Sequence, residues 1–237
     1  MSYFDKGVFR LMKFEKNLSY RGRIISLAFV ALMILAIREV VKSQFGEVPH
    51  FLPIPALIPL IIAWFLGKHY DQTMYLSTRD SLTGLYNRRY VMNNFAKYNA
   101  DKIKDFNIAV LLFDVNDFKE INDNYGHEFG DRVLEGLSSI LEQSFSKKDI
   151  IARWGGDEFL VLTKFNDEND LQGKIELFEN NLKAMEIKNN VSVSIGKAIF
   201  PTDGKQLNDL LLIADQNMYA VKTNHKLANE EVGHWGQ

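Results

Sequence analysis

The 237-residue sequence contains no cysteine. Without thiols the chain can form no disulfide framework, no thiolate metal site and no cysteine nucleophile. It also lacks an excess of charge of either sign, because 28 basic side chains are balanced by 30 acidic ones, which leaves a formal net charge of −2. Binding to nucleic-acid phosphates requires clustered positive charge, so no nucleic-acid partner is expected.

Two common phosphate-binding motifs are also missing. No G-x-x-x-x-G-K-[ST] sequence occurs, and no G-x-G-x-x-G follows a predicted strand. The segment that begins at Asp114 fails as a calcium loop, because its fifth and sixth positions lack the oxygen ligand and the glycine. Any nucleotide or metal chemistry must therefore use another arrangement.

Long hydrophobic runs are present, and both lie near the N-terminus. Residues 24–37 form an uncharged run of fourteen, and residues 51–67 one of seventeen. A membrane-spanning helix needs roughly 17–25 mostly apolar residues, so the first run also needs its flanks, with arginines reaching the interface. We predict a two-helix transmembrane hairpin over 24–67. The alternatives are core helices of a soluble sensor and, for the first run, a cleaved signal peptide.

Basic residues set the expected orientation of this hairpin. Only two arginines or lysines lie between the runs, whereas six precede the first run: Lys6, Arg10, Lys13, Lys16, Arg21 and Arg23. By the positive-inside rule both termini are expected in the cytoplasm. The chain is then a two-pass protein of the cell membrane, in contact with lipid, whose residues 1–23 form a cytoplasmic N-terminal segment.

The remainder of the chain alternates predicted helices and strands, which indicates an α+β domain. Residues 68–79 contain no helix breaker and are expected to continue the second run as a linker helix. Strands are expected at 107–113, 150–154, 159–163 and 191–195. Helices are expected at 133–145, after a polar turn at 166–170 through about 185, and at about 206–222. We expect this domain to cover 80–227 and a short tail to cover 228–237.

Carboxylates stand at the ends of two predicted core strands. Asp114 ends one strand, while Asp157 and Glu158 occupy a hairpin turn in which Gly155 and Gly156 allow a tight bend. If the strands are neighbours, three carboxylates meet at one sheet edge, which suits Mg²⁺ and phosphoryl chemistry. From the turn alone, a solvated acidic hairpin tip is the simpler interpretation.

Five motifs together resemble the GGDEF family. They are DSLTGLYNRR at Asp80–Arg89, DVNDFKEIND at Asp114–Asp123, GHEFGD at Gly126–Asp131, the signature RWGGDEF at Arg153–Phe159, and the C-terminal set of Ser194–Gly196, Ala214–Asp215 and Tyr219–Lys222. They cover about 145 residues in the order and spacing of the family. By these motifs the chain is identified as a member.

The resemblance implies a fold and an activity. The expected fold is the palm-like nucleotidyl-cyclase domain, with a central, mainly antiparallel sheet flanked by helices. The expected enzyme is a diguanylate cyclase, a nucleotidyltransferase that uses Mg²⁺ or Mn²⁺ and condenses two GTP into cyclic di-GMP and two pyrophosphates across a homodimer. The alternative is a degenerate domain that serves as a nucleotide or cyclic di-GMP receptor or as an interaction module. The intact signature favours the enzyme.

The resemblance also implies roles for the carboxylates. Asp114, Asp157 and the backbone carbonyl of Val115 match metal ligands of the family. Glu158 matches a further ligand or the base that accepts the proton of the attacking 3′-hydroxyl, so the expected catalytic residues are Glu158 and Asp157. Gly155, Gly156 and Phe159 belong to the signature itself.

Substrate-binding residues follow in the same way. Asn122 and Asp131 match readers of the guanine edge, whose donor pair adenine lacks. Phe118 and Lys119 match the loop beneath the triphosphate, and Lys222 matches a phosphate-binding lysine.

Departures from the family pattern qualify these expectations. Asn116 stands where many relatives have aspartate, at a position that is not the main metal ligand, so activity is expected to survive. Relatives usually end K-x-x-G-R-N, whereas this chain has Lys222, His225 and Lys226 in the sequence KTNHKL. Lys226 keeps a positive charge for the triphosphate but loses the arginine fork, so weaker binding is expected.

The inhibitory R-x-x-D site of the family is degenerate. The chain reads SKKD over residues 146–149, so Asp149 is kept but Ser146 replaces the arginine. Product inhibition through this site is therefore not expected, unless Lys147 or Lys148 substitutes.

Overall fold

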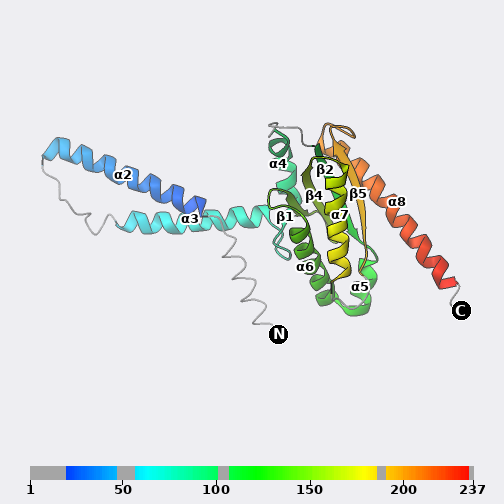
Figure 1. The fold of residues 1–237 in the computed structure, drawn as a ribbon. Coiled ribbons are helices and arrows are strands. Elements are labelled where there is room, and N and C mark those ends of the chain that lie inside the picture. The colour runs from blue at the N-terminus through cyan, green and yellow to red at the C-terminus, as the bar shows by residue number, and fades with distance from the viewer. Residues whose placement is uncertain (1–19, 47–56, 101–106, 186–190, 235–237) are drawn as a thin grey trace. The chain divides into compact units, whose positions relative to one another are not determined.

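The computed structural model describes residues 20–46, 57–100, 107–185 and 191–234. The chain divides into two compact units, Met1–Thr78 and Arg79–Gln237. The first unit contains two long helices and the second contains the sheet (Figure 1).

The helices of the first unit are α2 (Arg21–Phe45) and α3 (Leu57–Thr78), which pack side by side (Figure 1). Glycine at the crossing lets the backbones of the two helices approach closely. A Cβ on Gly67 would lie only 2.6 Å from the Cα of Arg23. The hydroxyl of Ser26 also donates to the carbonyl of Ala63 across the pair, at 2.8 Å. Small side chains at such a crossing allow the close backbone approach seen here.

A buried ion pair fixes one end of this helix pair. The Asp71 carboxylate of α3 accepts hydrogen bonds from the Gly22 N–H at 2.7 Å and from Arg23 Nε at 3.1 Å. The first turn of α2 contains no acidic residue of its own, so Asp71 caps it from the neighbouring helix. The start of α2 is thereby tied to one position along α3.

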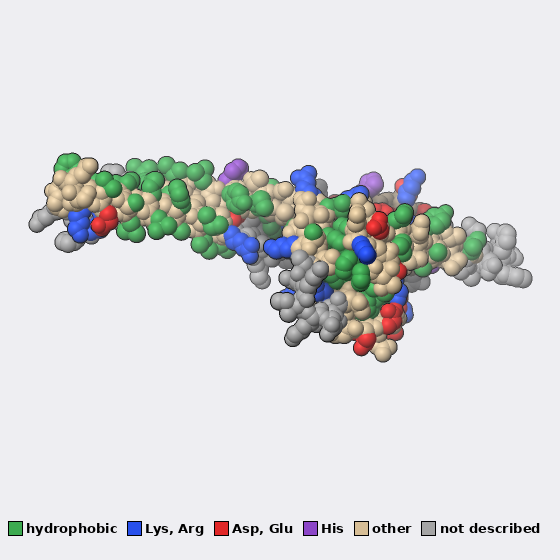
Figure 2. All heavy atoms as spheres, turned by 90° about the horizontal axis from the view of Figure 1, so that it is seen from above, with side chains coloured by type: hydrophobic (Ala, Val, Ile, Leu, Met, Phe, Trp, Pro, Cys, Tyr) green, Lys and Arg blue, Asp and Glu red, His purple; other side chains and the backbone are tan. Residues whose placement is uncertain are grey.

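The first predicted membrane run forms a helix that could cross a membrane. Within α2 an 18-residue window has a mean hydropathy of 2.4, and none of it is buried in the chain. Figure 2 shows hydrophobic side chains along the visible surface of the helix pair. Among the described residues no other helix is both long enough and apolar enough to cross a membrane. In α3 the apolar residues give way to a polar stretch at Lys68, and 51–56 lie outside the described residues, so the two-helix crossing stays a prediction.

The second unit is built on one five-stranded sheet. Its elements in chain order are β1 (Tyr86–Asn87), α4 (Arg88–Ala100), β2 (Asn107–Val115), α5 (Phe118–Tyr125), α6 (His127–Ser144), β3 (Ile150–Arg153), β4 (Glu158–Phe165), α7 (Glu168–Lys183), β5 (Val193–Phe200) and α8 (Leu207–His234). The strand order is β1-β3-β4-β2-β5, in which β1–β3 is parallel and the other pairs are antiparallel. The predicted α+β class is confirmed, with a mixed sheet flanked by helices.

Strand β2 lies inside the sheet and is covered on both faces. Leu111 and Phe113 belong to the core beneath α6 and α7, whereas Val110 and Leu112 belong to the core beneath α4 and α8. Burial on both faces explains why β2 reads as an unbroken apolar run. Figure 1 shows the helices on the two sides of the sheet.

Strand β5 begins and ends later than predicted. The expected range was 191–195, but β5 spans Val193–Phe200 and pairs with β2 from Val115↔Val193 to Ile108↔Phe200. The sequence alternates only weakly after Ile195, so its pairing with the buried central strand, rather than local pattern, sets its length.

Two glycines provide a matched test of this packing. A Cβ on Gly196 of β5 would lie 2.0 Å from the Ala214 carbonyl oxygen of α8, whereas one on Gly173 of α7 would meet nothing within 4 Å. We expect Gly196→Ala to destabilise the protein by about 2–3 kcal/mol through overpacking. Gly173→Ala should stabilise it by about 0.5–1 kcal/mol, because alanine favours the helix. Thermal unfolding of both variants measures the contrast, and equal melting temperatures would contradict the packing of α8 on β5.

Candidate active site

The antiparallel register of β2 and β4 places two carboxylates side by side. Asp114 pairs with Glu158, and Asp157 immediately precedes Glu158. The turn before them is closed by the Trp154 and Gly155 N–H groups, which donate to the Glu158 carbonyl at 2.8 and 3.2 Å. The two strands are therefore neighbours, which is the condition under which the sequence placed three carboxylates at one sheet edge.

These carboxylates repel one another in a partly buried place. Burial raises the pKa of Asp157, and the charge of Asp114 raises it further. Burial also raises the pKa of Glu158, with added contributions from Asp114, Asp157 and Asp215. Acidic groups whose pKa values rise for these two reasons lie where a cation would relieve the repulsion.

A lysine from the far end of the chain supplies one such cation. The Lys222 Nζ of α8 lies 2.6 Å from Asp114 Oδ1, and the Asp114 side chain is 8% exposed. Partial burial lowers the pKa of Lys222, but the hydrogen bond to Asp114 and the negative charges of Asp114, Asp157 and Asp117 together outweigh it, so the net shift is upward. The lysine that was predicted to bind phosphate thus contacts a predicted metal ligand.

The donor set fits a divalent cation by its chemistry. Within the described parts of the chain, no group of three or more acidic or histidine side chains is already arranged around one metal position. The backbone can add one more oxygen ligand, the carbonyl of Val115. The Val115 N–H donates to the Asp157 carbonyl at 3.3 Å, so this N–H points toward β4. In a strand the N–H and C=O of one residue point to the same side, so the Val115 carbonyl faces β4 as well. Carboxylate and carbonyl oxygens are the ligands that Mg²⁺ prefers.

Arg153 holds the signature turn in shape. Its Nε and Nη2 donate to the Gly156 carbonyl at 3.1 and 2.7 Å, while Nη1 donates to Asp80 Oδ1 at 3.2 Å. Asp80 in turn accepts from the N–H and hydroxyl of Thr83. Sequence reasoning missed this positioning role of Arg153.

The predicted guanine readers lie on two consecutive helices. Asn122 is on α5 and Asp131 is on α6, one residue beyond Gly130. A Cβ on Gly130 would lie 2.0 Å from the Asn122 Oδ1, so only glycine lets the amide approach α6 this closely. Phe118 and Lys119 begin α5, next to the end of β2. The side chain of Lys226 lies outside the described part of the chain.

The degenerate inhibitory site is internally bonded. Asp149 is buried, and its Oδ2 accepts from the Ser146 N–H at 2.9 Å. Its Oδ1 lies 3.4 Å from the Tyr98 hydroxyl, which also donates to the Leu162 carbonyl. Both oxygens of the Asp149 carboxylate therefore have partners within the domain, one in the turn and one on Tyr98.

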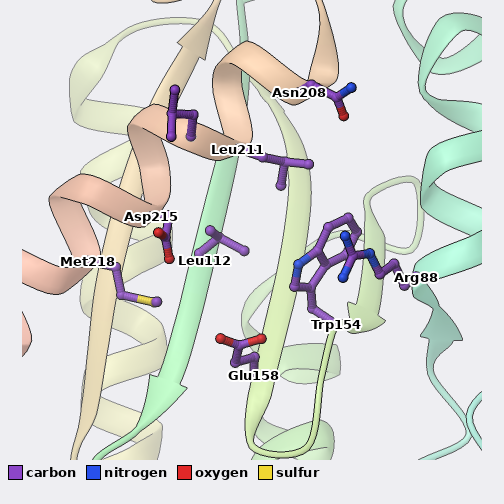
Figure 3. A pocket seen from close by; sticks show the side chains of 9 residues that line it. Arg88, Leu112, Trp154, Glu158, Asn208, Leu211, Asp215 and Met218 are labelled. Carbon is purple, nitrogen blue, oxygen red and sulfur yellow. The ribbon is translucent and has the colours of Figure 1, made fainter.

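A cavity of about 290 Å³ opens beside Glu158, between α4 and α8. Glu158 reaches it from β4, with Asp215 on one side and Trp154 on the other (Figure 3). The guanidinium of Arg88 lies 4.6 Å from the centre of the Trp154 ring. Glu158, the carboxylate whose pKa is raised, therefore borders an open pocket.

Comparison with known proteins gives one consistent result. The family model described as "Diguanylate cyclase, GGDEF domain" matches residues 77–227. The chain is 38% identical over 154 residues to the signaling protein YkoW of Bacillus subtilis, and this match covers 62% of this chain and 19% of YkoW. It is 29% identical over 190 residues to the probable diguanylate cyclase DgcC of Escherichia coli K12, and this match covers 72% of this chain and 49% of DgcC.

Solved structures agree on the fold. The GGDEF domain of YfiN (TpbB) from Pseudomonas aeruginosa superposes with a TM-score of 0.57 at 30% identity, covering 62% of this chain and 89% of that domain. The chain spans about a fifth to a half of the length of the two curated relatives above.

Proposed function

The chain belongs to the GGDEF domain family of diguanylate cyclases, and we propose that it condenses two GTP molecules into cyclic di-GMP and two pyrophosphates. The observation that carries this proposal is the pairing of Asp114 with Glu158 beside an intact Gly155–Phe159 signature. A receptor would need no such carboxylate cluster, so the repelled acidic groups favour the enzyme over a degenerate binding domain.

In the proposed reaction each GTP serves as both nucleophile and phosphorus donor. The 3′-oxygen of one nucleotide bonds to the α-phosphorus of the other, while the bond from that phosphorus to the pyrophosphate oxygen breaks. The hydroxyl proton passes to the Glu158 carboxylate, whose raised pKa improves it as a base near neutral pH. Because the product is a ring of two nucleotides, two copies of the domain must face each other.

A divalent ion, Mg²⁺ or Mn²⁺, would be held by Asp114, Asp157, Glu158 and the Val115 carbonyl. When bound it would acidify the attacking hydroxyl and stabilise the leaving pyrophosphate. Lys222 and Lys119 would bind the triphosphate, as would Lys226.

Substrate selection is proposed for the α5–α6 pair. The amide of Asn122 and the carboxylate of Asp131 would accept the two donors on the guanine edge, and Phe118 would support the loop beneath the phosphates. Adenine lacks these two donors and would leave the acceptors of Asn122 and Asp131 unpaired, so the pair would discriminate against adenine.

The helix pair α2–α3 is proposed to anchor the enzyme in the cell membrane with both termini in the cytoplasm. The observations in support are the exposed apolar surface of α2 and the basic residues that precede it. Confinement to a surface raises the effective concentration of domains and so favours the pairing that catalysis needs.

Substitution of Glu158 tests the role of the carboxylate cluster. In the full-length chain purified in detergent, with GTP and Mg²⁺, chromatography should detect cyclic di-GMP, and Glu158→Gln should lower its rate at least about a hundredfold. A group whose pKa is raised by folding contributes stability below its unfolded pKa and loses it as pH rises through its folded pKa. Near pH 7, without divalent ions, Glu158→Gln should therefore raise the melting temperature by about 1–2 °C.

The control is Glu176→Gln, because Glu176 is exposed on α7 and bonds to Gln172 of its own helix. It should change neither activity nor the melting temperature. Absence of product from a dimeric parent chain would overturn the proposed activity. Retained turnover by Glu158→Gln would overturn the role of Glu158 alone.

Product inhibition provides a second test. Because Ser146 replaces the arginine and Asp149 is bonded internally, added cyclic di-GMP should leave the initial rate unchanged. Ser146→Arg should make the rate sensitive to cyclic di-GMP, since a guanidinium can grip a phosphate at two points. A parent chain that is strongly inhibited by low concentrations of product would contradict this expectation.

A further inference from the structure

Four side chains form a hydrogen-bonded series behind the proposed metal site. Asn116, which is 5% exposed, follows β2, and its Nδ2 donates to the Ser192 Oγ at 3.0 Å. Its Oδ1 accepts from the Ser194 hydroxyl at 2.7 Å. The Ser192 Oγ also lies 3.2 Å from Nε2 of His225 on α8. The series therefore joins the end of β2, the start of β5 and the last third of α8.

The backbone at Asn116 is held by the same residue. The Asn116 N–H donates to the Ser192 carbonyl at 3.0 Å, on the β5 side of β2. A trans peptide is planar, so its C=O points opposite to its N–H. The C=O of this peptide belongs to Val115, and it is therefore directed away from β5 toward β4, which carries Asp157 and Glu158 at its start.

We propose that Asn116, Ser192 and His225 are positioning residues that hold the Val115 carbonyl toward the carboxylates and thereby set the metal affinity of the site. The inference rests on the proposed function, because it assumes that the carbonyl is a metal ligand. Groups that orient a ligand without touching the metal commonly alter its affinity about 10–100-fold.

The donors and acceptors of the series explain why Asn116 and His225 occur together. The amide of Asn116 donates to Ser192, which leaves the serine hydroxyl hydrogen available to an unprotonated Nε2 of His225. Both residues stand at departures from the family pattern, and both contact the same serine. His225 also lies one helical turn beyond Lys222, so α8 is tied to the site at two successive turns.

Mn²⁺ binding to the full-length chain in detergent tests the proposal without turnover. Electron paramagnetic resonance of free Mn²⁺ is recorded in the presence of a GTP analogue with a methylene between the α- and β-phosphorus. Ser192→Ala and His225→Ala should each raise the Mn²⁺ dissociation constant roughly tenfold. At saturating Mn²⁺ the analogue should bind with unchanged half-saturation, because the guanine readers are not altered.

Conservative variants and a matched control separate positioning from general stability. Asn116→Asp should keep Mn²⁺ affinity, since its carboxylate can accept from both serine hydroxyls while the other tautomer of His225 donates to Ser192. Asn116→Ala should lose it. His225→Gln should restore affinity through its amide. Thr223→Ala is the control, because Thr223 is exposed on the same part of α8 and bonds to the Tyr219 carbonyl of its own helix.

The outcomes distinguish the two proposals. A parent chain that binds no Mn²⁺ overturns the proposed metal site and this inference with it. A parent chain that binds Mn²⁺ while Ser192→Ala and His225→Ala bind it equally well overturns the positioning role alone. Weakened Mn²⁺ binding at an unchanged melting temperature, with rescue by His225→Gln, supports it.

Discussion

The register between β2 and β4 is the constraint on which the domain depends. It sets Asp114 directly across from Glu158 and leaves Asp157 at the adjoining turn. Burial and mutual repulsion raise the pKa values of Asp157 and Glu158, so the arrangement opposes the stability of the isolated fold. Such a cluster is expected where a cation and phosphates complete the charge balance, which connects an unfavourable feature of the fold to the proposed chemistry.

Neighbouring elements hold the repelled groups in place. Arg153 bonds to the Gly156 carbonyl and to Asp80, which fixes the turn against the start of the domain. Lys222 contacts Asp114 from α8, and the bond between Asn116 and Ser192 fixes the end of β2 against β5. Each contact joins segments that are distant in sequence, so the site is assembled only when the sheet and α8 are packed together.

The sequence was sufficient for features that depend on local pattern. The apolar run of β2 and the carboxylates at strand ends indicated a central strand and a sheet-edge site, and the motifs indicated the family. It was insufficient for features set by tertiary contact: the two-residue parallel β1, the length of β5, the Arg153 clamp and the Lys222–Asp114 pair, whose partners lie 108 residues apart. The second apolar run was long enough by residue count, but within the described residues only α2 meets the criteria for a span.

The central claim is that the repelled carboxylates form a cation site. It is tested most directly by a nuclear magnetic resonance titration of the Asp157 and Glu158 carboxyl carbons in the full-length chain, with and without Mg²⁺. The account predicts raised pKa values for both residues without Mg²⁺ and a fall of both when Mg²⁺ is added. Titration curves that are identical in the two conditions would contradict it.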